Sequence, residues 1–163
     1  MNDTRDKDGP SPAGGTVAPP EDAPWRNPEP GRLVGRGHPI GDLLEAHEWR
    51  VLEERNGYLL LDCALPARLR NFRGSLFGGF TPVYVDLVAL HTFRAGRVRG
   101  SPRHPLVTVN MRTDYFEPVV SDHFRIESEV VHRRGRTCLV QTRFFDAHGT
   151  LLVFALTTLR ELA

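Results

Sequence analysis

The sequence predicts an α+β domain in which one long central helix is wrapped by a curved antiparallel sheet of about six strands. Two observations support this fold class. The run from Phe80 to Phe93 is apolar on nearly every side of a helix, which is typical of a helix that the rest of a domain surrounds. Two strand patterns precede this run and four follow it, an order that is typical of α+β domains.

The central helix is expected to begin near Gly79 and to end near Phe93. Pro82 suits its first turn, where a missing N–H costs no hydrogen bond. Two adjacent glycines leave backbone N–H groups open at the positive end of the helix dipole, where a carbonyl oxygen or an anion can approach. Apolar side chains recur at helical spacing on one face and continue round the other: Val83, Tyr84, Leu87, Val88, then Val85, Ala89 and Leu90.

The other elements are marked by periodic patterns and by turns. A short helix is expected over residues 40–47. Asn56-Gly57 is a two-residue hairpin signal, and Arg134-Gly135 and His148-Gly149 supply the glycines that tight antiparallel connections need. The last strand is apolar on both faces, which predicts a place inside the sheet. Strand patterns cover residues 49–55, 58–65, 106–117, 124–133, 137–146 and 150–162.

The chain of 163 residues is divided into an N-terminal tail and one domain. The first 30 residues hold seven of the thirteen prolines and almost no aliphatic residues, so residues 1–32 are assigned to a disordered tail and residues 33–163 to the domain. The net charge of +1 argues against nucleic-acid binding. Because there is no membrane-length apolar run and no signal-peptide core, we expect a cytoplasmic protein, with Cys63 and Cys138 as reduced core residues.

Asp86 is the leading candidate for a reactive group. It lies two turns into the central helix and is the only acidic residue between Asp62 and Asp114. A carboxylate with apolar neighbours costs free energy unless it has a partner. An ion pair with Arg73 or Arg94 would explain this carboxylate, and a role in catalysis would explain it equally well. The residues alone leave both interpretations open.

A motif around the helix start resembles the signature N-x-x-G-x-x-H-G-G-x-x-x-x-x-x-D of PaaI-like hotdog-fold acyl-CoA thioesterases. The similarity continues from Val107 to Pro118 and at the Arg134-Gly135-Arg136 hairpin, and covers about residues 45–162. Phe77 stands where the family has histidine, and a phenyl ring makes none of the hydrogen bonds of an imidazole. The residues at the family's spacing are Asn71, Gly74, Gly78, Gly79 and Asp86.

The resemblance implies a hotdog fold and the hydrolysis of an acyl-CoA thioester to a free acid and coenzyme A, without metal or cofactor, since coenzyme A is part of the substrate. In that mechanism Gly78 presents its N–H to the thioester carbonyl, and Asn71 orients substrate or water. Asp86 of a neighbouring subunit attacks the thioester or activates a water, which Thr108 could hold. The structural alternatives are a turn-forming Asn, a Gly required by its backbone angles and a β-branched Thr in a strand.

The resemblance also implies a homodimer with two sites at the interface, and often a dimer of dimers. Guanidinium groups near the site would suit the phosphates of coenzyme A, although a solvated surface explains each of them equally well. Phe77 could favour an aromatic or bulky acyl group. A non-catalytic hotdog protein that binds acyl thioesters, or a dimeric interaction module, is the alternative function. The expected substrate-binding residues are Phe77, Gly79, Arg94, Arg134 and Arg136.

Overall fold

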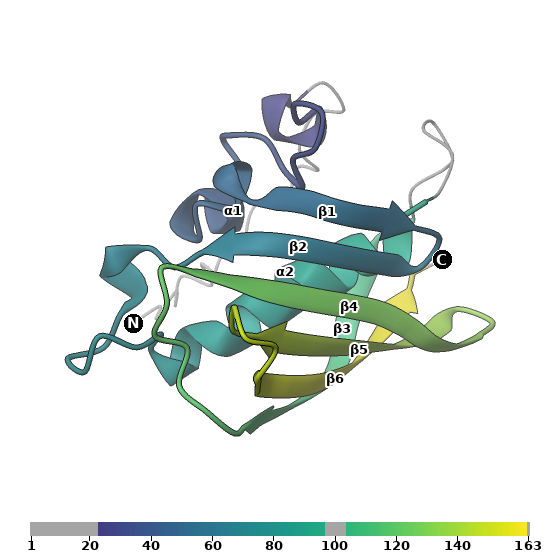
Figure 1. The fold of residues 1–163 in the computed structure, drawn as a ribbon. Coiled ribbons are helices and arrows are strands. Elements are labelled where there is room, and N and C mark those ends of the chain that lie inside the picture. The colour runs from purple at the N-terminus through teal and green to yellow at the C-terminus, as the bar shows by residue number, and fades with distance from the viewer. Residues whose placement is uncertain (1–22, 97–103, 163) are drawn as a thin grey trace, which may run out of the picture.

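In the computed structural model, which describes residues 23–96 and 104–162, one antiparallel sheet curves around one long helix (Figure 1). The helix, α2, spans Thr81–Arg94. The sheet has the strand order β1-β2-β4-β5-β6-β3, so β6 lies inside it and β1 and β3 are its edges. The predicted fold class and the interior position of the last strand are confirmed. The strands are β1 Arg50–Arg55, β2 Tyr58–Ala64, β3 Leu106–Tyr115, β4 His123–Arg134, β5 Thr137–Phe145 and β6 Leu151–Glu161.

An aromatic cluster fixes α2 against the sheet. Tyr84 of α2 is fully buried, stacks on Trp49 with ring centroids 5.1 Å apart, and donates a hydrogen bond of 3.2 Å to the Ala64 carbonyl. Phe124 of β4 and Phe144 of β5 pack against the same tyrosine ring. Burial raises the pKa of Tyr84, so its hydroxyl remains a neutral donor. Because bulky groups hold the middle of the helix, α2 is a rigid support for residues at its start and along its exposed side.

The segment before β1 departs from the sequence prediction in two ways. The expected helix over residues 40–47 is interrupted: α1 spans Pro39–Leu43, and a separate 3₁₀ turn, η2, spans Ala46–Glu48. Glu45 between them has a left-handed φ of 54°, which cannot continue a right-handed helix. Helical periodicity alone does not reveal such a break.

Residues 23–32, which the sequence assigns to the tail, also make contacts with the domain. Among the described residues, Ala23 is buried, and a 3₁₀ turn, η1, spans Pro24–Arg26. The Val51 N–H of β1 donates to the Gly31 carbonyl at 2.8 Å, so residues 23–32 partly cover the exposed edge of β1. Composition misses these contacts because they are made largely by the backbone. Residues 1–22 lie outside the described part of the chain.

His38 makes the stability of α1 dependent on pH. Its Nδ1 accepts a hydrogen bond of 2.9 Å from the Gly41 N–H and caps the helix, which a protonated imidazole cannot do. Burial lowers the pKa of His38, although Asp42 acts in the opposite direction. Because the pKa of His38 is lowered in the folded state, the stabilisation that the cap provides is complete above the unfolded-state pKa, about 6.5. This stabilisation is lost as the pH falls below that value.

We therefore expect the free energy of unfolding to fall on acidification from pH 7.5 to 5.5, by about 0.5–1 kcal/mol through this cap. The matched variant is His38→Asn, because an asparagine at the same position can cap the helix without titrating. Urea unfolding of both proteins at the two pH values measures the difference. Equal losses of stability in the two proteins would contradict the role of His38.

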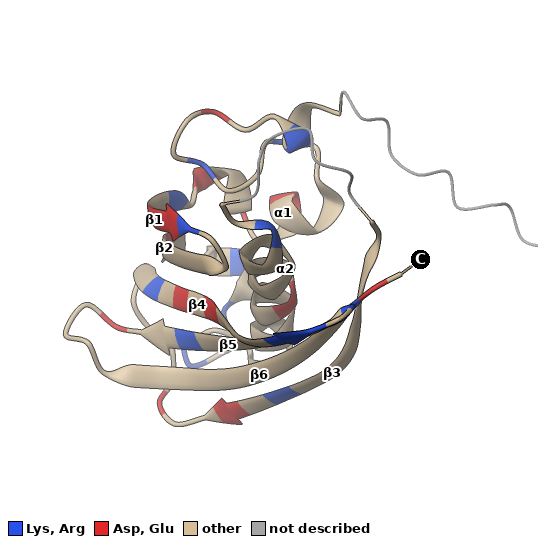
Figure 2. Cartoon of the chain, turned by 90° about the vertical axis from the view of Figure 1, so that its right-hand side faces the viewer, with Lys and Arg blue, Asp and Glu red and all other residues tan. Residues whose placement is uncertain are grey.

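The remaining surface carries charges of both signs. In the view of Figure 2, acidic and basic residues are interspersed over the helices and strands. Within residues 23–96 and 104–162, no helix has the length and apolar character needed to cross a membrane. Cys63 and Cys138 are both buried and are not joined in a disulfide, as the sequence predicts.

Candidate functional site

The chain enters α2 through a tight loop, residues 71–78, which we call the glycine turn. Asn71 holds it together: its Oδ1 accepts from the backbone N–H groups of Arg73 (2.9 Å) and Ser75 (3.3 Å). The Nδ2 of Asn71 donates to the Ser75 hydroxyl at 2.8 Å. Gly74 adopts a φ of +80°, a left-handed conformation that favours glycine. The Asn71 side chain is thus engaged in shaping the turn, and a direct role on substrate or water stays a prediction.

Gly78 stands at the end of this turn and begins the 3₁₀ turn η4, Gly78–Phe80, which leads into α2. Its carbonyl accepts hydrogen bonds from the Thr81 N–H and from the Tyr115 hydroxyl, the latter at 2.9 Å. No hydrogen bond among the described residues uses the Gly78 N–H. A fixed and exposed N–H at the start of a helix is suited to bind a carbonyl oxygen that gains negative charge.

Phe77 covers the second glycine of the pair. A Cβ added to Gly79 would lie 2.8 Å from the Phe77 ring, so only a glycine at position 79 allows the ring to lie there. The ring also packs edge to face on Phe80, with centroids 5.9 Å apart, and 54% of the residue is exposed. An apolar surface therefore lies directly beside the open N–H of Gly78, at the position where the resembling family has histidine.

Asp86 of α2 and Thr108 of the edge strand β3 are brought together at the surface of the domain. Asp86 is half-buried on α2, and its Oδ1 accepts a hydrogen bond from the Thr108 hydroxyl of β3. The pairing of β3 with β6 shifts register between Thr108 and Asn110, next to the pair Thr108 and Leu159. Because Leu159 is fully buried, this pairing turns Thr108 toward the helix. The bond orients the Asp86 carboxylate, the group that sequence analysis names as reactive.

Gly78 and Asp86 of one chain are too far apart to act on the same carbonyl. They are separated by eight residues along η4 and α2, which corresponds to roughly 12 Å along the axis. A reacting carbon must lie about 3 Å from both the attacking group and the oxyanion donor. The two groups therefore require a second copy of the chain if they share one substrate.

The arginines named from the sequence lie at the other end of α2 from Gly78. Arg94 is the last residue of α2, and Arg134 and Arg136 flank the exposed β4–β5 turn. The neighbouring Arg133 places its guanidinium 4.6 Å from the ring centroid of Phe93, which locates this turn beside the helix end. Residues 97–103 of the predicted basic loop lie outside the described residues.

Two further residues, Arg160 and Tyr115, lie near predicted site residues in the fold, and the sequence alone does not identify them. Arg160 of β6 pairs directly with Val107, next to Thr108, and therefore lies on the face of the sheet opposite to the one that Thr108 and Leu159 turn toward α2. Tyr115 reaches Gly78 from the end of β3. Both contacts depend on the strand order, in which the first strand after the helix pairs with the last strand of the chain. In the described ranges, no group of three or more His, Cys, Asp and Glu residues could hold a metal ion.

Comparisons with known proteins identify the family and the fold of the chain. The sequence profile of the thioesterase superfamily matches residues 73–153, a range that contains Gly78, Asp86 and Thr108. No curated protein sequence gives a significant match.

Several solved structures share the fold. The PaaI protein of Escherichia coli, from the phenylacetic acid degradation operon, has a TM-score of 0.62 and 13% identity over 76% of this chain and 83% of its own. A hypothetical thioesterase from Streptococcus pneumoniae, determined with coenzyme A, has a TM-score of 0.62 and 18% identity over 71% and 87%. A thioesterase from Haemophilus influenzae has a TM-score of 0.65 and 12% identity over 77% and 84%. The chain therefore belongs to the thioesterase superfamily of hotdog-fold proteins, with PaaI among its structural relatives.

Proposed function

We propose that the protein hydrolyses acyl-CoA thioesters to a free carboxylic acid and coenzyme A, with Asp86 and Gly78 as the central groups. The observation that carries this proposal is that one helix presents two such groups: an exposed, fixed N–H at its start and a carboxylate that a threonine hydroxyl orients. Membership of the thioesterase superfamily supports a thioester as the bond that is cleaved. The coenzyme A in the pneumococcal structure supports the thiol part of the substrate.

The proposed chemistry needs only these groups and water. The Gly78 N–H binds the thioester oxygen and stabilises the negative charge that builds on it as the carbonyl carbon becomes tetrahedral. Asp86 removes a proton from the attacking water, or attacks the carbon itself to form an anhydride that water then hydrolyses. The C–S bond breaks, the thiolate of coenzyme A leaves and takes up a proton, and the acid is released. Thr108 holds the carboxylate, and through it the water, in place.

A homodimer formed along β3 would complete the site. β3 is an edge of the sheet, and an edge strand exposes unpaired N–H and C=O groups. Apolar side chains along and just after it are exposed as well, including Val109 at 60%, Tyr115 at 53% and Phe116 at 57%. Pairing of two β3 strands would cover these groups and supply Asp86 of one copy to Gly78 of the other. The resemblance of the sequence to the PaaI-like family extends this proposal to a pair of such dimers.

The parts of the substrate can be assigned in the same way. We assign the phosphates of coenzyme A to the guanidinium groups of Arg94, Arg134 and Arg136, at the far end of α2 from Gly78. The acyl group would then lie toward Phe77, whose exposed ring favours an aromatic or bulky chain by apolar contact.

Release of free thiol from short, long and aromatic acyl-CoA substrates tests the proposed function. Turnover of at least one class is expected, together with a dimeric or tetrameric mass in solution. Thermal stabilisation by acyl-CoA without thiol release would instead support the binding protein that the Phe77 replacement suggests, because a ligand that binds only the folded state stabilises it.

A further inference from the structure

Arg70 lies directly before the glycine turn and contacts both this turn and the connection between β3 and β4. One of its nitrogens, Nη1, donates to the carbonyls of Gly74 (2.7 Å) and Val120 (2.8 Å). The other, Nη2, donates to the Asp122 carboxylate at 2.6 Å. One planar guanidinium therefore joins the glycine turn to the connection between β3 and β4, which only a side chain with several fixed donors can do.

We propose that Arg70 is a positioning residue that sets the place of the Gly78 N–H by clamping the glycine turn to residues 115–122. The proposal rests on the proposed function, because it concerns the oxyanion donor of the same site. Arg70 itself does not touch the reacting atoms in this scheme.

Residues 115–122 hold the glycine turn at three points. At one end the Tyr115 hydroxyl bonds the Gly78 carbonyl. In the middle the Leu76 N–H donates to the Val119 carbonyl at 2.8 Å. At the other end stands the Arg70 clamp. Loss of the clamp leaves the turn free to shift at the end where Asn71 shapes it, and displacements of about 1 Å in a catalytic group can cost about 100-fold in rate.

The two carbonyl contacts are the important part of the clamp. The Asp122 side chain is 92% exposed, and an exposed ion pair contributes little. The Arg70 side chain is only 20% exposed, so the guanidinium is largely covered, and its donors are fixed on the carbonyls of Gly74 and Val120. A lysine at this position would keep the charge but could not reproduce the geometry of the fork.

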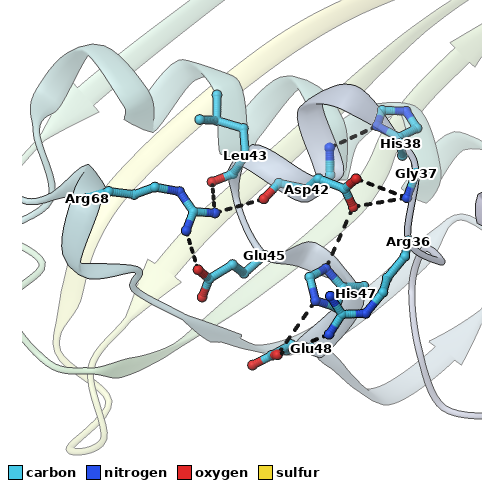
Figure 3. Close-up of polar contacts among 10 residues, drawn as sticks. Arg36, Gly37, His38, Asp42, Leu43, Glu45, His47, Glu48 and Arg68 are labelled. Atoms are coloured by element: carbon cyan, nitrogen blue, oxygen red, sulfur yellow. Dashed lines mark hydrogen bonds and ion pairs between the residues drawn. The ribbon is translucent and has the colours of Figure 1, made fainter.

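Arg68 provides a matched control within the same stretch of chain. Figure 3 shows that its guanidinium donates to two backbone carbonyls, those of Asp42 and Leu43 at 2.8 Å each, and to the Glu45 carboxylate. Arg68 thus donates to the same kinds of acceptor as Arg70, namely two backbone carbonyls and one carboxylate. These contacts, however, hold the C-terminal end of α1, beside an open polar hollow of about 370 Å³, and not the glycine turn.

The test compares Arg70→Ala with Arg68→Ala in thiol release and in amide hydrogen exchange of the full chain. We expect Arg70→Ala to lower kcat per folded protein by about 10- to 100-fold with KM unchanged, because an oxyanion donor acts mainly in the transition state. Arg70→Lys should recover part of the loss. Exchange over residues 71–78 should accelerate in Arg70→Ala and remain as in the wild type in Arg68→Ala. Arg68→Ala should keep the wild-type kcat, whatever it does to the melting temperature.

The outcomes separate this proposal from the proposed function. A wild-type kcat in Arg70→Ala overturns the positioning role while leaving the thioesterase in place. An equal fall in kcat in the two alanine variants also overturns it, because general destabilisation would then be the cause. If the wild type releases no thiol from any substrate, the proposed function fails, and exchange decides alone: unchanged exchange over residues 71–78 in Arg70→Ala overturns the clamp.

Discussion

Replacing Asp86 by asparagine is expected to abolish thiol release almost completely. An asparagine has nearly the same shape and its Oδ1 can still accept the hydrogen bond of Thr108, so the packing between α2 and β3 should be preserved. The amide is neither a base nor a nucleophile at neutral pH, and removal of a general base typically costs about 10²- to 10⁴-fold. The measurement is kcat at saturating acyl-CoA, normalised to folded dimer, because removal of a half-buried charge can also change stability.

Asp62→Asn is the matched control for this substitution. Asp62 lies on β2, where its carboxylate pairs with Arg50 and His123, and β2 is separated from β3 by three other strands. The same chemical change there should leave kcat per folded protein within about twofold of the wild type, since Asp62 lies away from the proposed site, with three strands between β2 and β3. Substantial turnover by Asp86→Asn would contradict the catalytic role and would favour a purely structural function for the bond with Thr108.

The fold could be predicted from the sequence because its main signals are local. The long apolar run around Tyr84 admits only a surrounded helix, and Pro82 limits where that helix begins. Glycines after Asn56, Arg134 and His148 mark the hairpins, and all three adopt left-handed conformations in the structure. Each of these features is set by neighbours in the chain, so no knowledge of distant contacts is needed.

The site could be predicted only in part because its assembly is not local. Asp86 stands out in the sequence as an isolated carboxylate, yet its partner Thr108 is identified by a strand register that only the folded sheet defines. The contacts of Arg70 with Val120 and of Tyr115 with Gly78 likewise join segments that lie far apart in the chain. The sequence resemblance supplied Gly78, Asp86, Asn71 and Thr108, whereas the contacts that connect these residues to one another and to Arg70 and Tyr115 follow from topology.

Replacing Gly78 by proline should lower kcat by about 10²- to 10³-fold, the usual cost of losing one oxyanion donor. Proline removes the N–H and fits the first position of a helix. It also requires an extended residue before it, and Phe77 already has φ −64° and ψ 125°. Gly78→Ala is the control: its Cβ would lie 3.9 Å from the Tyr115 ring, an ordinary contact, and its N–H remains. Equal activities of the two variants would exclude the N–H as the oxyanion donor.

A mixture of Asp86→Asn and Gly78→Pro chains tests whether each site is shared between two copies. Each variant alone should be inactive. In a mixed dimer, the intact Gly78 of one copy meets the intact Asp86 of the other, so one of the two sites is complete. Random exchange of equal amounts makes half of the dimers mixed, and about a quarter of the wild-type activity should return. If both groups acted within one chain, no site would be complete and no activity would return. The roughly 12 Å between the two groups along the helix axis predicts the first result.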